Sequence, residues 1–318
     1  MEMVRSLTLE AVRLTEAAAL YASRYMGRGD EESSYHSASE AMTRVFSTID
    51  IDGKIINGAD DRSSSLGDGA VVGNRQGPDV DLVVKPLDGK KTCATGGHNA
   101  ISVMAVGSKG SFLSTPSIHM EKIAVGQDAK GIVDINQPPD INIKRVARAK
   151  GKYIEDVTVC VLNRDRNAGL VQAIQKTGAR IKFIQDGDIS GAISAALIDN
   201  PIDILMGFGG AKEGVLAAAA LKCLNGDIQA RFVYDNDEEK ALIREHVGND
   251  PEKIYKISDM VKGNDIMVSA TGVTDGVILP GVRFFPGGAE TNSIVIRQKT
   301  HTLRMVRAIH QFDYKPIF

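Results

Sequence analysis

Apolar residues near the start of the chain recur at intervals of three and four positions. They are Leu7, Ala11, Leu14, Ala18, Tyr21, Ala22 and Tyr25. This spacing puts them on one face of a helix, and Gly27 and Gly29 then supply an end. The pattern predicts an amphipathic helix over residues 1–26, and a second apolar stripe from Ala38 to Phe46 indicates another helix.

Shorter apolar runs follow, each bounded by turn residues. Residues 51–56 are read as a turn entering a strand, and residues 60–68 as a polar loop. The run 80–84 is predicted to be a strand that ends at Lys85-Pro86-Leu87-Asp88-Gly89, because proline and glycine interrupt regular pairing. Residues 100–106 and 118–125 fit either two strands or a strand and a helix, and Pro138-Pro139 marks a break.

From about Tyr153 the pattern alternates between strand-like and helix-like runs. These runs are 157–162, 168–176, 181–184, 189–198, 202–206 and 213–224. Such βαβαβα order is typical of a parallel sheet with right-handed crossovers. The expected later strands are 231–234, 266–270, 277–279 and 294–297. The change of pattern suggests two parts, residues 1–152 and 153–318.

Composition narrows the class of protein. The 318 residues carry 38 basic and 40 acidic side chains, a net charge of −2, and no charge block suited to nucleic acid. No apolar run reaches the ~18 residues of a membrane span, and no signal peptide is recognisable. Three cysteines without close spacing favour buried thiols in a reducing compartment. We therefore expect a cytoplasmic protein whose partner is a small molecule.

Several stretches, taken together and in order, resemble the class II fructose-1,6-bisphosphatases, which include the dual fructose/sedoheptulose bisphosphatases. They are Thr15-Glu16-Ala17-Ala18-Ala19, Gly27-Arg28-Gly29-Asp30, Met120-Glu121-Lys122, Asp186-Gly187-Asp188, Gly207-Phe208-Gly209-Gly210-Ala211-Lys212-Glu213-Gly214 and Ser269-Ala270-Thr271-Gly272. The match runs from the first helix to Ile309-His310, which is essentially the whole chain.

The resemblance implies a layered α-β-α-β-α fold like that of the fructose bisphosphatases and inositol monophosphatases. It also implies a sugar bisphosphate substrate of carbohydrate metabolism such as gluconeogenesis, a homodimer or homotetramer, and hydrolysis assisted by Mg²⁺ or Mn²⁺. Hard divalent cations need clustered carboxylate oxygens; they neutralise phosphoryl charge and orient the attacking water.

Most carboxylates of that cluster are substituted in this chain. The resemblance places ligand positions on Tyr35, Ala59 and Lys85, and a threonine that positions the nucleophile falls on Lys90. The Tyr35 segment aligns loosely, so Glu31 or Glu32 is an alternative ligand there. Among the usual carboxylates, Asp88, shortened from Glu, and Glu213 keep their places. We expect weak metal affinity.

Lys85 changes the chemistry most. An ammonium in place of a metal ligand repels Mg²⁺ and still attracts a phosphate oxygen. It replaces the cation's charge but not its Lewis acidity or its effect on bound water. Lys85, Asp88 and Lys90 are therefore the candidates for any altered chemistry.

The residues that the resemblance assigns to sugar-phosphate binding are better kept. Arg164 and Arg166 follow a strand and can form forked hydrogen bonds to phosphate oxygens, and the glycine run before Glu213 enters a helix whose N-terminus suits an anion. The full candidate set is Asp88, Gly89, Lys90, His119, Arg164, Asp165, Arg166, Asp186, Gly187, Asp188 and Gly210.

Non-functional interpretations of these residues are also open. Lys85 and Lys90 can be solvated lysines in a disused site, and the Asp186-Gly187-Asp188 turn and the two arginines can be surface features. Three functions remain open: a sugar-phosphate binder without turnover, an enzyme of lyase, isomerase or aldol type using Lys85 and Lys90, and a residual metal phosphatase.

Overall fold

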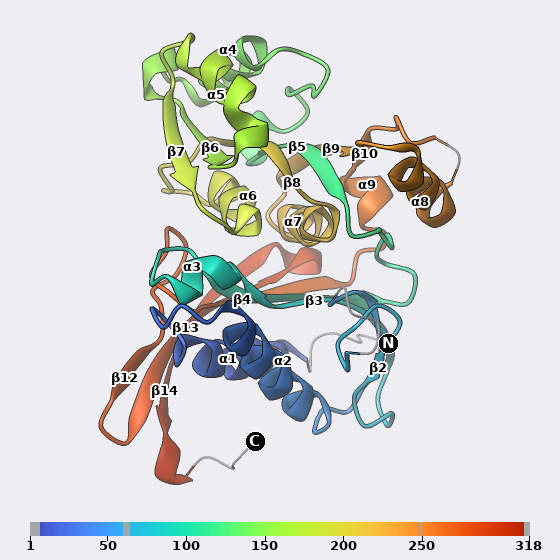
Figure 1. Ribbon diagram of the computed structural model, residues 1–318, viewed down its shortest axis with the longest axis vertical. Helices are drawn as coiled ribbons and strands as arrows, with labels where there is room; N and C mark the ends of the chain where they lie inside the picture. The colour runs from blue at the N-terminus through green and yellow to red at the C-terminus, as the bar shows by residue number, and fades with distance from the viewer. Residues whose placement is uncertain (1–6, 60–63, 249, 315–318) are drawn as a thin grey trace. The chain divides into compact units, whose positions relative to one another are not determined.

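The computed structural model describes residues 7–59, 64–248 and 250–314. The chain divides into two compact units (Figure 1). Unit 1 consists of residues 1–112 and 263–318, and unit 2 of residues 113–262. Among the described residues, no helix is long and apolar enough to span a membrane.

Unit 1 contains one large mixed sheet. Its strands are β1 (Asp52–Asn57), β2 (Val71–Val72), β3 (Asp79–Asp88), β4 (Ile101–Ser108), β11 (Ile266–Gly272), β12 (Arg283–Phe285), β13 (Gly288–Arg297) and β14 (Thr302–Gln311). They follow the order β12-β13-β11-β4-β3-β1-β2, with β14 paired to β13. Its helices are α1 (Thr8–Ser23), α2 (Glu31–Phe46) and α3 (Lys90–Ala94), with short 3₁₀ turns at Gln298–Thr300 and Phe312–Tyr314.

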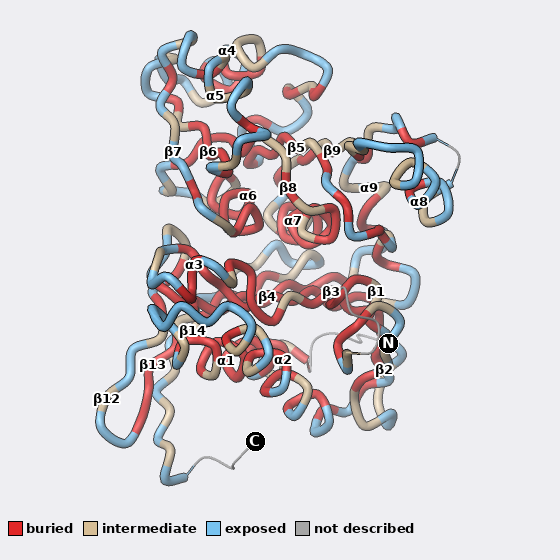
Figure 2. Tube along the Cα trace, viewed as in Figure 1, coloured by how far each residue is buried: buried red, intermediate tan, exposed pale blue. Residues whose placement is uncertain are grey.

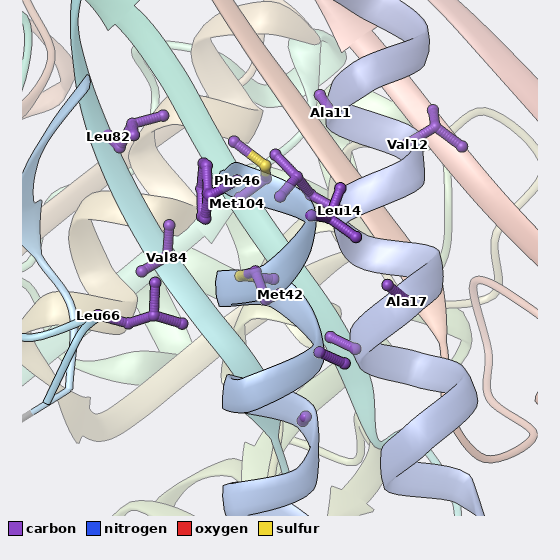
Figure 3. Packing of buried hydrophobic residues seen from close by; sticks show 14 of the residues in the cluster. Ala11, Val12, Leu14, Ala17, Met42, Phe46, Leu66, Leu82, Val84 and Met104 are labelled. Carbon is purple, nitrogen blue, oxygen red and sulfur yellow. The ribbon is translucent and has the colours of Figure 1, made fainter. Parts of the chain in front are cut away.

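Helices α1 and α2 lie against this sheet and bury their apolar stripes on it. Leu14 of α1 and Phe46 of α2 meet Leu82 of β3 and Met104 of β4 in the same core (Figure 3). All four side chains are almost completely buried, so each contributes roughly 1.5–3 kcal/mol of hydrophobic stabilisation. The helix predicted over residues 1–26 is confirmed from Thr8 to Ser23, and its expected first six residues lie outside the described part of the chain.

Unit 2 is built on a second sheet. Its strands are β5 (His119–Val125), β6 (Thr158–Leu162), β7 (Arg180–Ile184), β8 (Ile204–Gly210), β9 (Asp227–Val233) and β10 (Tyr255–Lys256), in the order β10-β9-β5-β8-β6-β7. Its helices are α4 (Pro139–Lys150), α5 (Ala168–Gln175), α6 (Asp188–Ala196), α7 (Ala211–Cys223), α8 (Asp237–Val247) and α9 (Ile257–Met260). Short 3₁₀ turns occur at Gln127–Ala129, Ile154–Asp156 and Asp165–Asn167.

Both faces of the second sheet are covered. Helix α4 shares a core with Ile123 and Val125 of β5, whereas Met120 and Lys122, at alternate positions of that strand, lie beside Gly214 of α7. The β6, β7 and β8 strands are parallel, as the βαβ pattern predicts. The sheet as a whole is mixed, because β5 is antiparallel to β8 and β9. Figure 2 shows the central strands buried and α8 largely exposed.

Three sequence predictions differ from the structure. The strand expected to end at residue 84 continues to Asp88, because Pro86 lies in a bulge between Lys85 and Asp88, where the ladder requires no proline N–H. Residues 277–279 form bends instead of a strand. Pro139 is the first residue of α4, where its fixed φ suits a helix start, so the proline pair marks a helix N-terminus.

The structure also groups the chain differently from the expected halves 1–152 and 153–318. Residue 152 lies inside unit 2, and residues 263–318 return to unit 1. The reason is long-range pairing: β11 forms an antiparallel ladder with β4 across Ile266–Gly272. Such pairing leaves no local signal in the hydrophobic pattern.

Candidate functional site

A cavity of about 460 Å³ opens in unit 1. Its lining comes from α2, from the residues after β1, from the end of β3 and from the start of α3. The side chains are Glu32, Tyr35, His36, Ser39, Glu40, Gly58, Ala59, Ser64, Ser65, Lys85 and Lys90. The structure thus brings Tyr35, Ala59, Lys85 and Lys90, four positions that the sequence associates with a metal site, to one cavity.

Local sequence explains this convergence. Asp30 caps α2 by accepting a 2.9 Å hydrogen bond from the Ser33 N–H, which fixes the helix turn that carries Glu32. The turn before it is held to α3, because the Gly27 N–H donates to the Cys93 carbonyl and the Gly29 N–H to the Ala94 carbonyl. Backbone hydrogen bonds therefore join the turn before α2 to the last residues of α3, whose first residue, Lys90, lines the cavity.

Lys90 lies at the first position of α3 and is engaged at its ammonium group. Its Nζ is 3.1 Å from Glu32 Oε1 and 5.0 Å from the centre of the Tyr35 ring. The Glu32 side chain is 83% exposed, so this ion pair contributes little to stability. Because this ion pair is accessible to solvent, a ligand anion can take the place of Glu32 as the partner of the Lys90 ammonium group.

Lys85 and Asp88 stand at opposite ends of the β3 bulge. Lys85 is partly buried and lines the cavity, while Asp88 is only 5% exposed and is not among the lining residues named above. Gly89, which follows, has φ +93°, and a Cβ there would lie 3.3 Å from Ala100. Glycine is therefore needed to turn the chain from β3 into α3.

The described lining suits a hard divalent cation poorly. It contains two lysines, and both of its carboxylates are already paired: Glu32 with Lys90, and Glu40 with His36 and Arg44. Across residues 7–59, 64–248 and 250–314, no three His, Cys, Asp or Glu side chains converge as a metal cluster. Asp60 and Asp61, next to Ala59, lie outside the described residues, and Glu213 belongs to unit 2.

In unit 2 a buried ion pair joins the middle of β5 to the start of α6 and the end of β8. Lys122 Nζ of β5 donates to Asp188 of α6 and, at 2.8 Å, to the Gly210 carbonyl. The Lys122 side chain is 2% and the Asp188 side chain 7% exposed. A Cβ on Gly209 would lie 2.0 Å from Asp188 Oδ2. The absence of a side chain at residue 209 is what allows the pair to form.

Arg164 and Arg166 lie on the turn after β6. Arg164 pairs with Asp186, the first residue of the Asp186-Gly187-Asp188 turn, and Arg166 Nε donates to the Phe208 carbonyl at 3.2 Å. Asp165 begins the 3₁₀ turn Asp165–Asn167, which contains Arg166. Within unit 2, Arg164 therefore joins the turn after β6 to the acidic turn, and Arg166 joins it to the end of β8.

The glycine run before α7 is more ordered than the sequence suggests. Gly207 to Gly210 are the last residues of β8 and pair with β5, from Lys122 opposite Gly207 to His119 opposite Gly210. The Phe208 N–H donates to Asn167 Oδ1 and the Ala211 N–H to the Ile118 carbonyl. The strand predicted over 202–206 therefore extends to Gly210, and the ladder continues to the start of α7.

His119 is the edge residue of this network. Burial, reinforced by the nearby charges of Arg166 and Lys122, lowers the pKa of its imidazole below the usual value. The shift favours the neutral ring, in which one nitrogen accepts and the other donates a hydrogen bond. His119 can contact a hydroxyl or a phosphate oxygen without adding a fixed charge.

Sequence reasoning missed two residues that hold this network. Lys122 was visible within Met120-Glu121-Lys122, but nothing in the sequence indicates that it is buried against Asp188. Asn167 is completely buried and bridges two strand ends, accepting from the Phe208 N–H and donating to the Leu162 carbonyl at 2.8 Å. The one feature of the sequence that indicated Asn167 was its position directly after Arg166, in the segment that carries both arginines.

Sheets interleaved with helices define an α/β layered protein. The family model described as bacterial fructose-1,6-bisphosphatase, glpX-encoded, matches residues 5–310. The chain therefore belongs to the class II fructose-1,6-bisphosphatase family.

Curated relatives agree with this assignment. The chain is 38% identical over 325 residues to a fructose-1,6-bisphosphatase class 2 of Haemophilus influenzae, with 98% of each chain covered. It is 37% and 36% identical to proteins of two Synechococcus strains named D-fructose 1,6-bisphosphatase class 2/sedoheptulose 1,7-bisphosphatase, covering 98% of this chain and 97% of each relative.

Proposed function

We propose that this protein binds a sugar phosphate or bisphosphate and that metal-dependent hydrolysis is lost or strongly reduced. The observation that carries the proposal is the pair of lysines, Lys85 and Lys90, in the cavity of unit 1. Two ammonium groups attract phosphate oxygens and repel a divalent cation. Family membership supports the ligand class.

Mg²⁺ or Mn²⁺, when bound in a family enzyme, neutralises the phosphoryl group and orients water. The described lining of this cavity does not match the ligand set that such ions require. The ammonium groups of Lys85 and Lys90 attract a phosphate group but do not activate water. The proposed function is therefore binding without hydrolysis.

The proposed sugar-phosphate contacts in unit 2 are His119, Arg164, Asp165, Arg166, Asp186, Gly187, Asp188 and Gly210, and those in unit 1 are Asp88, Gly89 and Lys90. Support for Arg164 and Arg166 comes from their place after β6, where Arg164 pairs with Asp186 and Arg166 donates to the Phe208 carbonyl. Guanidinium groups bind phosphate oxygens through forked hydrogen bonds. A homodimer or homotetramer, proposed by family resemblance, is checked by light scattering during gel filtration.

Hydrolysis is tested by phosphate release from fructose 1,6-bisphosphate at high protein concentration with Mn²⁺ or Mg²⁺. The controls are a chelator and the Glu213→Ala variant, which separate intrinsic turnover from a contaminating phosphatase. We expect no release that depends on both metal and Glu213. Release that depends on both would establish a residual phosphatase and overturn the proposal.

Binding is tested by thermal unfolding with fructose 1,6-bisphosphate and sedoheptulose 1,7-bisphosphate, with and without chelator. A ligand at 100 times its Kd stabilises the fold by about 2.7 kcal/mol. We expect stabilisation that survives chelation and that Lys85→Met weakens roughly tenfold in Kd, or about 1.4 kcal/mol. Lys109→Met is the matched control, because Lys109 is 75% exposed and pairs with Asp79.

Borohydride treatment in the presence of a ketose phosphate separates binding from lysine chemistry. A Schiff base between a lysine and the ketose would be trapped as a stable secondary amine. We expect no covalent product, because the side chain of Lys90 is already paired with Glu32. Mass spectrometry that located an adduct on Lys85 or Lys90 would replace binding with altered catalysis.

A further inference from the structure

Two of the motifs that carry the family resemblance, together with the end of the matched region, place polar side chains in one buried layer of unit 1. Thr15 and Glu16 lie on α1, Ser269 and Thr271 on β11, and His310 on β14; Thr291 and Ser293 of β13 lie among them. The five hydroxyl-bearing residues are at most 1% exposed. The Glu16 and His310 side chains are 9% and 10% exposed. None is among the cavity-lining residues or proposed sugar-phosphate contacts.

The contacts of the first chain favour one direction of donation. Thr15 Oγ1 lies 3.0 Å from the Val12 carbonyl and 3.3 Å from the Ala11 carbonyl, which can only accept, so the single Thr15 proton is directed into α1 and its neighbour Ser269 Oγ, at 3.1 Å, donates to it. Thr271 Oγ1, 2.8 Å from Thr15 Oγ1, then donates to it. Thr271 has no second proton and must accept from Ser293 Oγ, also at 2.8 Å. Donation runs from the sheet to α1.

The second chain crosses the same layer beside the first. Thr291 Oγ1 lies 3.0 Å from Glu16 Oε1 and 2.8 Å from His310 Nε2. Since Thr291 carries one hydroxyl proton, it donates to one of these neighbours and accepts from the other. Either His310 Nε2–H donates to Thr291 and Thr291 to an ionised Glu16, or a protonated Glu16 donates and His310 Nε2 is bare.

The geometry favours the first arrangement. His310 Nε2 is 3.9 Å from Glu16 Oε1. An N–H group on His310 Nε2 is therefore stabilised by the negative charge of the Glu16 carboxylate. The reverse arrangement requires a buried carboxyl group to hold a proton and puts a bare nitrogen lone pair beside it. Donation from His310 also matches the direction of the Thr271 and Thr15 chain, so both end on α1.

We propose that His310, Thr291 and Glu16 form a directed hydrogen-bond clasp that fastens the edge strand β14 to α1, with the proton on His310 Nε2 and Glu16 ionised. Strand β14 is also joined to β13 by its ladder and by the Arg307–Glu290 ion pair. Its ten residues include none that is fully buried, and its only strand partner among the described residues is β13. The clasp ties this strand to α1, which the Thr271–Thr15 hydrogen bond also joins to β11.

Histidine-selective ¹⁵N labelling tests the direction on the full-length protein. Long-range proton–nitrogen correlation spectra distinguish protonated from bare ring nitrogens, and a His310→Gln sample assigns the His310 signals. We expect His310 Nε2 to carry a proton at neutral pH. A bare Nε2 would reverse the chain, require a protonated Glu16 and overturn the proposal.

Variants at Thr291 test the connection itself. Thr291→Val keeps the side-chain shape but removes the relay, whereas Thr291→Ser keeps the hydroxyl. Breaking buried hydrogen bonds of this kind lowers Tm by about 3–6 °C in a protein of this size. We expect that loss for Thr291→Val with Thr291→Ser close to wild type, and equal melting of the two variants would show that the hydroxyl relay does not hold β14. If Thr291→Val fails to fold, the Thr291→Ser sample and the wild-type nitrogen spectra still decide the direction.

Discussion

At the scale of single residues, Lys122 and Asp188 are buried charges that depend on each other. Removing one partner leaves the other uncompensated, which costs about 3–5 kcal/mol in a buried pair. We expect Lys122→Met to lower the free energy of unfolding by this amount in urea titration. Asp156→Asn is the control, because the Arg180–Asp156 pair is about half exposed and surface pairs contribute roughly 0–1 kcal/mol. Equal losses would mean that the buried pair is not mutually required.

The second prediction at the scale of single residues concerns Gly209. Its alanine variant would place a Cβ 2.0 Å from Asp188 Oδ2 and 2.8 Å from Lys122 Nζ, so the ion pair must shift. We expect Gly209→Ala to destabilise unit 2 by about 1–3 kcal/mol, as overpacking does. Gly169→Ala is the control in α5, where a Cβ meets nothing within 4 Å and helix propensity rises. Thermal unfolding of both variants checks the contrast.

The sequence predicted the chemistry of single positions better than their surroundings. Lys85 and Lys90 were identifiable as substituted positions, and the structure adds that they line one cavity with Tyr35 and Ala59. The Glu32 partner of Lys90 could not be predicted, because 58 residues of chain separate them. The charge of a side chain follows from the residue type, whereas its burial and its ion-pair partner depend on long-range folding.

At the scale of elements, Asp203 ties the end of α4 to the start of β6 and β8. Burial alone would raise its pKa, but hydrogen bonds from Lys152 and Lys150 and from the Thr158 N–H lower the pKa below the usual value. A depressed aspartate pKa stabilises the fold above the unfolded-state value of about 3.9, and this contribution is lost as pH falls through the folded-state value.

The Asp203→Asn variant measures this contribution. We expect it to be less stable than wild type by about 1.5–3 kcal/mol at pH 7, the usual range for hydrogen bonds to charged groups. The difference should shrink as the pH falls below about 4, where the unfolded chain takes up the proton, and disappear once the pH has fallen through the lowered folded-state pKa of Asp203. Urea titrations at several pH values test this, and a difference that stayed constant down to pH 2 would contradict the charge-based account.

Elements with a strong local pattern were predictable, and those defined by their partners were not. The α1 stripe and the β6-α5-β7-α6-β8-α7 alternation follow from periodicity, and residues 118–125 proved to be a strand. Strand β14 was missed because its residues are exposed or half-buried on both faces, so no apolar alternation marks it. Helix α8 was missed because only Ile243 of its residues is buried.

At the scale of the whole molecule, unit 2 is one continuous segment, residues 113–262, inserted between the two segments of unit 1. Its entry and exit lie together, since the Leu113 N–H donates to the Met260 carbonyl at 2.9 Å. It has its own sheet and its own apolar core. A continuous segment with adjacent ends and a separate core meets the structural conditions for folding alone.

We therefore expect the fragment 113–262 to fold without the rest of the chain and to unfold cooperatively in urea. The Lys122→Met substitution should cost the fragment about the same 3–5 kcal/mol as it costs the full chain, because every atom of that pair's environment described above belongs to unit 2. Circular dichroism and urea titration of the fragment provide the measurement. A fragment without a cooperative transition would show that unit 2 draws essential stability from residues outside 113–262, and the sheet and core that define it would then be insufficient for folding.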